Sequence, residues 1–258
     1  MLSTPPLNES SPVSSPLNTS PLSEAPLASP PNRQWLDWTF LCVGLLTQII
    51  TFFVANDLSS ILNLKFEILN HKYELLSLIS GCLGICSVCL TAQGRLVAFV
   101  FGFAQVFTYT AICLRANLYG EVAINIYYFI TMIYGVYLWK RRMQPQTNRL
   151  ITRRLSWSHW GLMIILILLL SAGVGYARSR FSDDPTPYMD AFTTVAAIAA
   201  QLLMIFAYRD QWFLWMAVDI VAIVMWCVVG DYCMVAQYAF WCANCLYGYL
   251  RWTQLSKP

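Results

Sequence analysis

YGVYLW at residues 134–139 and YGYLRW at residues 247–252 carry the same motif, a Tyr-Gly pair with a tryptophan four residues after the glycine. Each motif closes a longer block, residues 73–139 in one case and residues 188–252 in the other, and both blocks open on a tyrosine. Each block also contains three apolar stretches. Internal similarity of this kind predicts two structural repeats, each built from three helices.

The composition of the chain is that of a membrane protein. Of its 258 residues, 58% are hydrophobic and 11% are charged, and the mean hydropathy of +0.54 is too high for a soluble domain. Apolar stretches of about 20 residues match a hydrocarbon core that is about 30 Å thick. They predict eight transmembrane helices, at residues 38–56, 74–92, 96–114, 118–139, 158–177, 190–208, 212–230 and 232–251.

The order of these spans predicts a parallel 3+1+3 repeat. A block of three spans would invert the block that follows, and the fifth span restores the orientation. We therefore expect an all-α polytopic membrane protein on the SWEET-like plan, preceded by one extra helix, with a site between the two bundles near the midplane. The expected parts are a tail at 1–34, the first helix and outer connection at 35–72, the first repeat at 73–139, a basic loop and linker helix at 140–187, the second repeat at 188–252, and a C-terminal tail at 253–258.

The basic residues predict the orientation in the membrane. Six of them lie in the connection KRRMQPQTNRLITRR, residues 140–154, which places that loop in the cytoplasm by the positive-inside rule. Both termini are then cytoplasmic and the protein lies in the inner (plasma) membrane, without a nucleic-acid partner. The Pro/Ser-rich residues 1–34 predict a disordered tail. Residues 58–69 fit either a short outer interfacial helix or a packed loop.

The motifs of several other classes of protein are missing from the sequence. It contains no P-loop of an ATP-driven pump and no HExxH or GxSxG motif. Cys82, Cys86 and Cys89 have helical spacing within one span and no histidine beside them, which favours packing over metal binding. We therefore expect no enzyme activity, no catalytic residue, no metal and no cofactor.

The seventh span carries an acid where a membrane helix rarely has one. Asp219 falls at its middle, where a charged side chain costs about 2.5–3.5 kcal/mol even on the mildest insertion scale. Trp212, Trp215 and Asp219 share one helical face, and two aromatic surfaces beside a negative charge suit a flat cationic or polar ring. The alternative is that Trp212 anchors the helix at the membrane interface and Asp219 is a neutral, hydrogen-bonded acid of the core.

Further polar side chains occur at comparable depth in other spans. Each of them either joins neighbouring helices or contacts a ligand, because an amide inside the membrane needs a hydrogen-bond partner. Acids near span ends, by contrast, are expected to be solvated by water or headgroups; these are Asp37, Glu121 and Asp190. The candidate substrate-binding residues on other spans are Gln105, Asn125, Tyr128, Gln237, Trp241 and Asn244, with Gln201 as a further buried amide.

Three stretches resemble the PnuC-type nicotinamide riboside transporters over roughly residues 73–252. They are LYGEVAINIYYFITMIYGVYLW (118–139), WFLWMAVD (212–219) and LYGYLRW (246–252). The resemblance implies a vitamin transporter of 3+1+3 architecture that works by passive transport, with cytoplasmic phosphorylation trapping the substrate. It also implies that Trp212 and Trp215 line the site and that Asn125 is its amide from the fourth span.

The sequence departs from this family at two places. The family usually has asparagine four residues after its second tryptophan, where this chain has Asp219, and an acid there favours a cationic substrate. The stretch GRLVAFVFG, residues 94–102, lacks the Trp and Pro that are common at the entry of the third span. This second departure leaves one wall of the pocket undefined.

The sequence thus predicts a transporter that imports nicotinamide riboside by facilitated diffusion and supplies NAD biosynthesis. The alternatives are a carrier of thiamine or riboflavin, a proton-coupled carrier that uses Asp219, a sugar carrier of the same architecture, or a sensor that binds without transport. The expected partners are the vitamin, the lipid bilayer and a cytoplasmic kinase, and homo-oligomerisation is left open.

Overall fold

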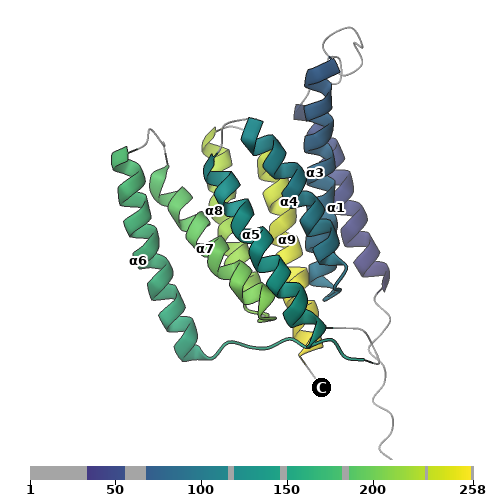
Figure 1. The fold of residues 1–258 in the computed structure, drawn as a ribbon, viewed down its shortest axis with the longest axis vertical. Helices are drawn as coiled ribbons and strands as arrows, with labels where there is room; N and C mark the ends of the chain where they lie inside the picture. Colours follow the sequence, from purple (N-terminus) through teal and green to yellow (C-terminus); the bar gives the residue numbers. More distant parts are fainter. Residues whose placement is uncertain are drawn as a thin grey trace, which may run out of the picture. The chain divides into compact units, whose positions relative to one another are not determined.

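The computed structural model describes residues 34–55, 68–115, 119–145, 150–181, 186–229 and 232–256. These residues form a helical protein (Figure 1), with only two isolated β-bridges in the described connections. The all-α fold class predicted from the sequence is confirmed. The helices are α1 (Gln34–Ala55), α3 (Ile68–Ala92), α4 (Ala98–Arg115), α5 (Tyr119–Lys140), α6 (Trp157–Phe181), α7 (Pro187–Ile205), α8 (Gln211–Val229) and α9 (Tyr232–Leu255).

Each predicted span coincides with one described helix, and the differences lie at the ends. Helix α3 begins six residues before the predicted start, and α7 ends at Ile205 instead of residue 208. The early end of α7 has a local cause, because Ala207 adopts a φ of 60° and turns the chain away from the helix axis. The predicted tail up to Arg33 and the stretch 56–67, which includes most of the predicted interfacial segment, lie outside the described residues.

Seven of the described helices are long and apolar enough to cross a membrane, which makes this a multi-pass membrane protein. The exception is α9, which is long enough with its 24 residues but carries Gln237, Asn244 and Arg251. One side of this helix packs against α8, α1 and α3, while Leu246 and Leu250 are exposed. Asn244 and Arg251 face neighbouring helices, since Asn244 contacts Cys89 of α3 and Arg251 binds Asp37 of α1.

The two blocks of three helices exchange contacts. In order along the chain, α3 packs on α4 and α4 on α5, while α7 packs on α8 and α8 on α9. Between the blocks, α9 packs against α3 and α5 packs against α7. Helix α1 packs on α3 and α9, and α6 packs chiefly on α7, so these two helices flank the others in Figure 1.

The tryptophans that close the two blocks each donate a hydrogen bond to the other block. The indole Nε1 of Trp139, at the end of α5, donates to the carbonyl of Met204 in α7 at 3.1 Å. Trp252, near the end of α9, donates to the carbonyl of Thr91 in α3 at 2.9 Å. Both the donors and the acceptors are 113 positions apart in the sequence.

The same spacing relates the ring contacts around these tryptophans. Phe99 lies edge-on to Trp139 with 4.9 Å between ring centroids, and Trp212 lies edge-on to Trp252 at 5.8 Å. Phe99 and Trp212 are again 113 positions apart. Trp139 and Trp252 also contact each other, at 5.7 Å, so the rings form one continuous aromatic cluster in the buried core.

The connection between α5 and α6 is held against the ends of other helices. We call the described residues of this connection, 141–145 and 150–156, the linker, and the side of the helices on which they lie the linker end. The backbone of Arg153 pairs with both Ala207 and Arg209 in the α7–α8 turn, with N–O distances of 2.8 and 2.9 Å. Thr152 Oγ1 donates to the carbonyl of Trp252 at 2.6 Å. The linker therefore joins the two blocks at this end, as its course along the foot of Figure 1 shows.

Asp210 fixes the linker to the start of α8. Its carboxylate is buried and accepts a hydrogen bond from the backbone N–H of Leu155 at 2.6 Å and from Trp160 Nε1 at 3.0 Å. Trp160 belongs to α6, so one carboxylate holds α6 and the linker on the α7–α8 turn. Aspartate is a residue type that is preferred at the N-cap of a helix. Here the side chain of Asp210 instead accepts hydrogen bonds from the linker and from α6.

Candidate functional site

Trp212 and Asp219 are both buried on α8, with 2% and 4% of their surface exposed. Trp212 is the second residue of the helix and packs closely on α9. A Cβ atom on Gly248 would lie 2.5 Å from the Trp212 ring, so only glycine permits this approach. The alternative in which Trp212 anchors the helix at the membrane interface is therefore wrong, because its ring lies inside the protein.

Asp219 lies between α8 and α9 with one weak donor beside it. The thiol of Cys245 is 3.4 Å from its Oδ2 atom, and no arginine or lysine in the described part of the chain forms an ion pair with it. A thiol is a weak donor, so it compensates little of the cost of burying a carboxylate. Asp219 can therefore accept a further hydrogen bond or a proton, or pair with a cation.

Helix α9 provides two buried N–H groups that lack partners among the described residues. The Nε1 atom of Trp241 and the Nδ2 atom of Asn244 are both inaccessible and unpaired. The amide oxygen of Asn244 accepts from the thiol of Cys89 on α3, at 3.7 Å. Leaving a buried donor unpaired costs about 1–3 kcal/mol, so these two N–H groups are candidates to donate to a bound substrate.

The two candidates on α5 are held in different ways. Asn125 is buried, and its Nδ2 atom donates to the carbonyl of Glu121 one turn earlier at 2.9 Å. In this conformation its amide N–H is thus used within its own helix. Tyr128 is half-buried and packs against the aromatic core cluster, as does Trp215 on α8.

The remaining two glutamines are less closely connected. Gln105 lies on α4 and is half-buried, with its Cγ atom 3.5 Å from where a Cβ of Gly84 on α3 would stand. Gln237 is half-buried on α9. Neither side chain forms a hydrogen bond with the residues that the structure describes. The contacts join candidates of α8 to α9, through Asp219 with Cys245 and Trp212 with Gly248, and Tyr128 of α5 packs against the same core cluster. Gln105 lies on the α3–α4 contact.

Sequence reasoning did not single out two cysteines that shape this region. Cys89 was expected only to pack among the helices, yet its thiol contacts Asn244, and the thiol of Cys245 contacts Asp219. The signal available was that Cys245 lies one turn after Trp241 on the same helix face. Gln201 joins α7 to α5 through a 3.2 Å hydrogen bond to Thr131, which is the helix-joining role left open for it.

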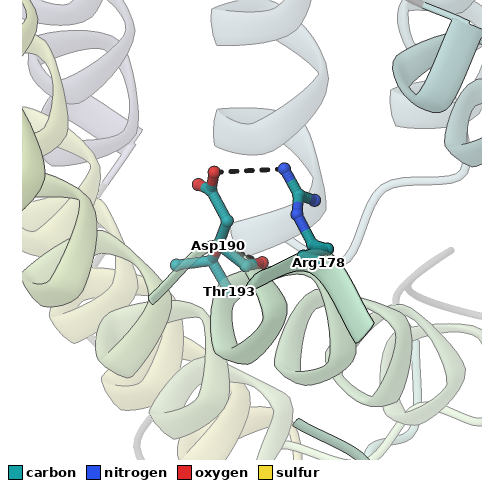
Figure 2. Close-up of polar contacts among 3 residues, drawn as sticks. All are labelled: Arg178, Asp190 and Thr193. Carbon is teal, nitrogen blue, oxygen red and sulfur yellow. Dashed lines mark hydrogen bonds and ion pairs between the residues drawn. The ribbon is translucent and has the colours of Figure 1, made fainter. Parts of the chain in front are cut away.

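The acids near span ends differ from each other. Asp190 forms an ion pair with Arg178 at 3.3 Å, with both side chains partly exposed (Figure 2), and Glu121 is exposed. Asp37 was expected to be solvated, and this expectation was wrong. It is buried and binds Arg251 of α9 at 2.6 Å, with Tyr247 donating a second hydrogen bond.

The eight described helices enclose a buried acid and unpaired donors, which defines a polytopic membrane protein with a polar interior, and comparison with known proteins identifies its family. Residues 74–254, well over half the chain, match the family model described as Nicotinamide mononucleotide transporter. This protein therefore belongs to that family, and the resemblance found in the sequence is confirmed.

Characterised relatives carry a consistent description. Nicotinamide riboside transporter PnuC of Haemophilus influenzae is 29% identical over 183 residues, covering 70% of this chain and 80% of the relative. The PnuC proteins of Neisseria mucosa and Escherichia coli are 28% and 23% identical, covering 67% of this chain and 70% and 83% of their own lengths. These relatives are named as transporters and not as enzymes.

A solved structure supports the fold. It is described as the crystal structure of the Vitamin B3 transporter PnuC and matches this chain with a TM-score of 0.66 at 24% identity. The match covers 86% of this chain and 92% of the solved chain. Because it extends beyond the residues that the family model matches, it includes more than the two blocks.

Proposed function

We propose that this protein carries nicotinamide riboside across the membrane. The observation that carries the proposal is the buried carboxylate of Asp219, which has only a thiol as its described donor and shares a helix face with Trp212 and Trp215. Nicotinamide riboside contains a flat pyridinium ring with one positive charge. An aromatic surface beside an anion suits such a ring by stacking and by charge.

The substrate is the riboside in preference to the mononucleotide that the family description names. The mononucleotide adds a phosphate group to the same ring, and a phosphate is repelled by a buried carboxylate. No described arginine or lysine forms an ion pair with Asp219 that would offset this repulsion. The names of the relatives agree, since each is described as a riboside transporter.

We infer that residues 73–139 and 188–252 are parallel repeats and that the substrate lies between them. The support is the set of contacts that recur 113 positions apart, in which Trp139 and Trp252 each donate to the other block. Two related bundles that touch reciprocally can rock about a shared site. The candidate residues on α5, α8 and α9 would line that site.

The basic residues support an orientation of the protein in the membrane. The basic linker places its end in the cytoplasm, with both termini on that side of the inner membrane. The sequence contains no P-loop that would couple transport to ATP, and we infer facilitated diffusion. Net import then requires the riboside to be consumed inside, which a cytoplasmic kinase achieves because the phosphorylated product carries a charge that Asp219 repels.

A second candidate is a proton-coupled carrier, favoured by the isolation of Asp219 from described basic residues. Uptake into proteoliposomes separates the two. Labelled nicotinamide riboside, nicotinamide mononucleotide, thiamine and riboflavin are each offered with and without a pH gradient. Riboside equilibration without a gradient is the expected result. Gradient-driven accumulation would establish the proton-coupled carrier, and uptake of another compound alone would reassign the substrate.

A further inference from the structure

At the linker end, the guanidinium groups of exposed arginines lie over aromatic rings. The guanidinium of Arg141 lies 4.2 Å from the ring centroid of Tyr137, and that of Arg154 lies 5.3 Å from Trp157. Arg153 lies 5.9 Å from the ring of Tyr208. All three arginines are exposed. We call Arg141, Arg153 and Arg154 the arginine rim.

The acids at this end do not neutralise the arginine rim. Within the described residues, the acids there are Asp37 and Asp210, and both are buried. Asp37 is already bound to Arg251 and Tyr247, and Asp210 to the linker and α6. Lys140, Arg95 and Arg209 add further positive charge at the same end. The exposed surface is therefore cationic.

The other end of the helices has a different arrangement. There, Arg178 is paired with Asp190 at 3.3 Å (Figure 2), and the exposed acid Glu121 lies at the start of α5. The guanidinium of Arg180 also lies over an aromatic ring, 5.4 Å from the ring centroid of Tyr176. An arginine on an aromatic ring thus occurs at both ends, but only the linker end has a group of them without nearby exposed acids in the described chain.

The arginine rim lies where lipid-facing helix surfaces end. On α5 the exposed apolar side chains Ile126, Ile130, Ile133 and Tyr137 recur at helical spacing, and Arg141 follows at the next position of that series. Trp157 is 80% exposed at the first position of α6, beside Arg154. A lipid whose chains lie on these faces has its phosphate at the level of the arginines.

We propose that the arginine rim binds the headgroups of anionic phospholipids. Guanidinium groups pair with phosphate through two parallel hydrogen bonds, and the aromatic rings beneath them hold the guanidinium planes at the interface. The apolar helix faces favour a lipid as the source of the phosphate over a soluble phosphate compound. This surface is distinct from the buried substrate site.

The experiment is a lipid titration of the intact protein followed by native mass spectrometry. Phosphatidylglycerol and phosphatidylcholine with the same acyl chains are compared for the unaltered protein, for R154A and for the triple variant R141A/R153A/R154A. We expect each arginine removed to weaken phosphatidylglycerol binding about fivefold, with phosphatidylcholine unchanged. The matched control is R180A, which removes one arginine from one ring at the opposite end and should leave phosphatidylglycerol binding nearly unchanged.

Three results would overturn the proposal. They are equal affinity for the two lipids, equal effects of R154A and R180A, or displacement of the lipid by stoichiometric glycerophosphoglycerol, which carries the headgroup without chains. If the triple variant does not fold, as judged by size-exclusion chromatography and circular dichroism, the single variants R141A and R154A against R180A give the same decision.

Discussion

At the scale of a single residue, the proposed function depends on the charge of Asp219. D219N keeps the shape of the side chain but removes the charge, so we expect uptake of the cationic riboside to fall. Losing one member of a buried charge pair costs at least about 2 kcal/mol, which corresponds to a roughly 30-fold fall in transport efficiency. Initial uptake rates in proteoliposomes measure this, with E121Q at an exposed acid as control. Unchanged uptake by D219N would remove Asp219 from the site.

Asp37 makes a different contribution, to stability. Its partner Arg251 is also largely buried, with 14% of its side chain exposed. Removing one member of a buried ion pair costs about 3–5 kcal/mol, so D37N should lower the melting temperature clearly. D190N breaks the partly exposed pair with Arg178 and should cost at most about 1 kcal/mol. Equal melting temperatures for the two variants would contradict the role of the buried pair.

At the scale of elements, close helix packing depends on single glycines. In G248A the added methyl group would overlap the ring of Trp212, so α8 and α9 must separate, at a cost of about 1–3 kcal/mol. Gly173 on α6 has no atom within 4 Å of its Cβ position, and G173A should be neutral or slightly stabilising. Thermal unfolding followed by tryptophan fluorescence compares the two. A stable G248A would show that the helices do not need this approach.

The exchanged tryptophan contacts give a prediction about the two blocks. W139F and W252F each remove one indole donor between the blocks. Each leaves the accepting carbonyl with only its backbone donor, Ala207 N–H for Met204 and Gly94 N–H for Thr91. We expect similar losses of about 1 kcal/mol for both, since the two contacts are equivalent. W38F, at a tryptophan that is 62% exposed on α1, is the control and should have no effect. A large effect of one variant alone would argue against equivalent blocks.

At the scale of the whole molecule, the sequence predicted what depends on local composition. The helices were found because a span must be about 20 residues long and apolar, and even α9 was recognised despite its polar residues. The partners of Asp37 and Asp210 were not found, because Arg251 and Trp160 are far away along the chain and no periodic pattern links them. The burial of Trp212 was missed for the same reason, since it depends on Gly248 of another helix.

At the scale of the whole molecule, the linker connects the two blocks at one end. The carboxylate of Asp210 contributes two of the hydrogen bonds that keep the linker and α6 against the α7–α8 turn. In D210A, the N–H groups of Leu155 and Trp160 both lose their acceptor, and leaving these half-buried donors unpaired costs at most about 1–3 kcal/mol each. The linker should then separate from the α7–α8 turn, because the remaining backbone pairing of Arg153 is short. Limited trypsin digestion followed by mass spectrometry measures this as faster cleavage after Arg153 and Arg154, with E121Q, at an exposed acid of the opposite end, as control. Cleavage of D210A at the rate of the unaltered protein would mean that the linker is held by its other contacts, and that the two blocks are joined at this end chiefly through Thr152 and Trp252.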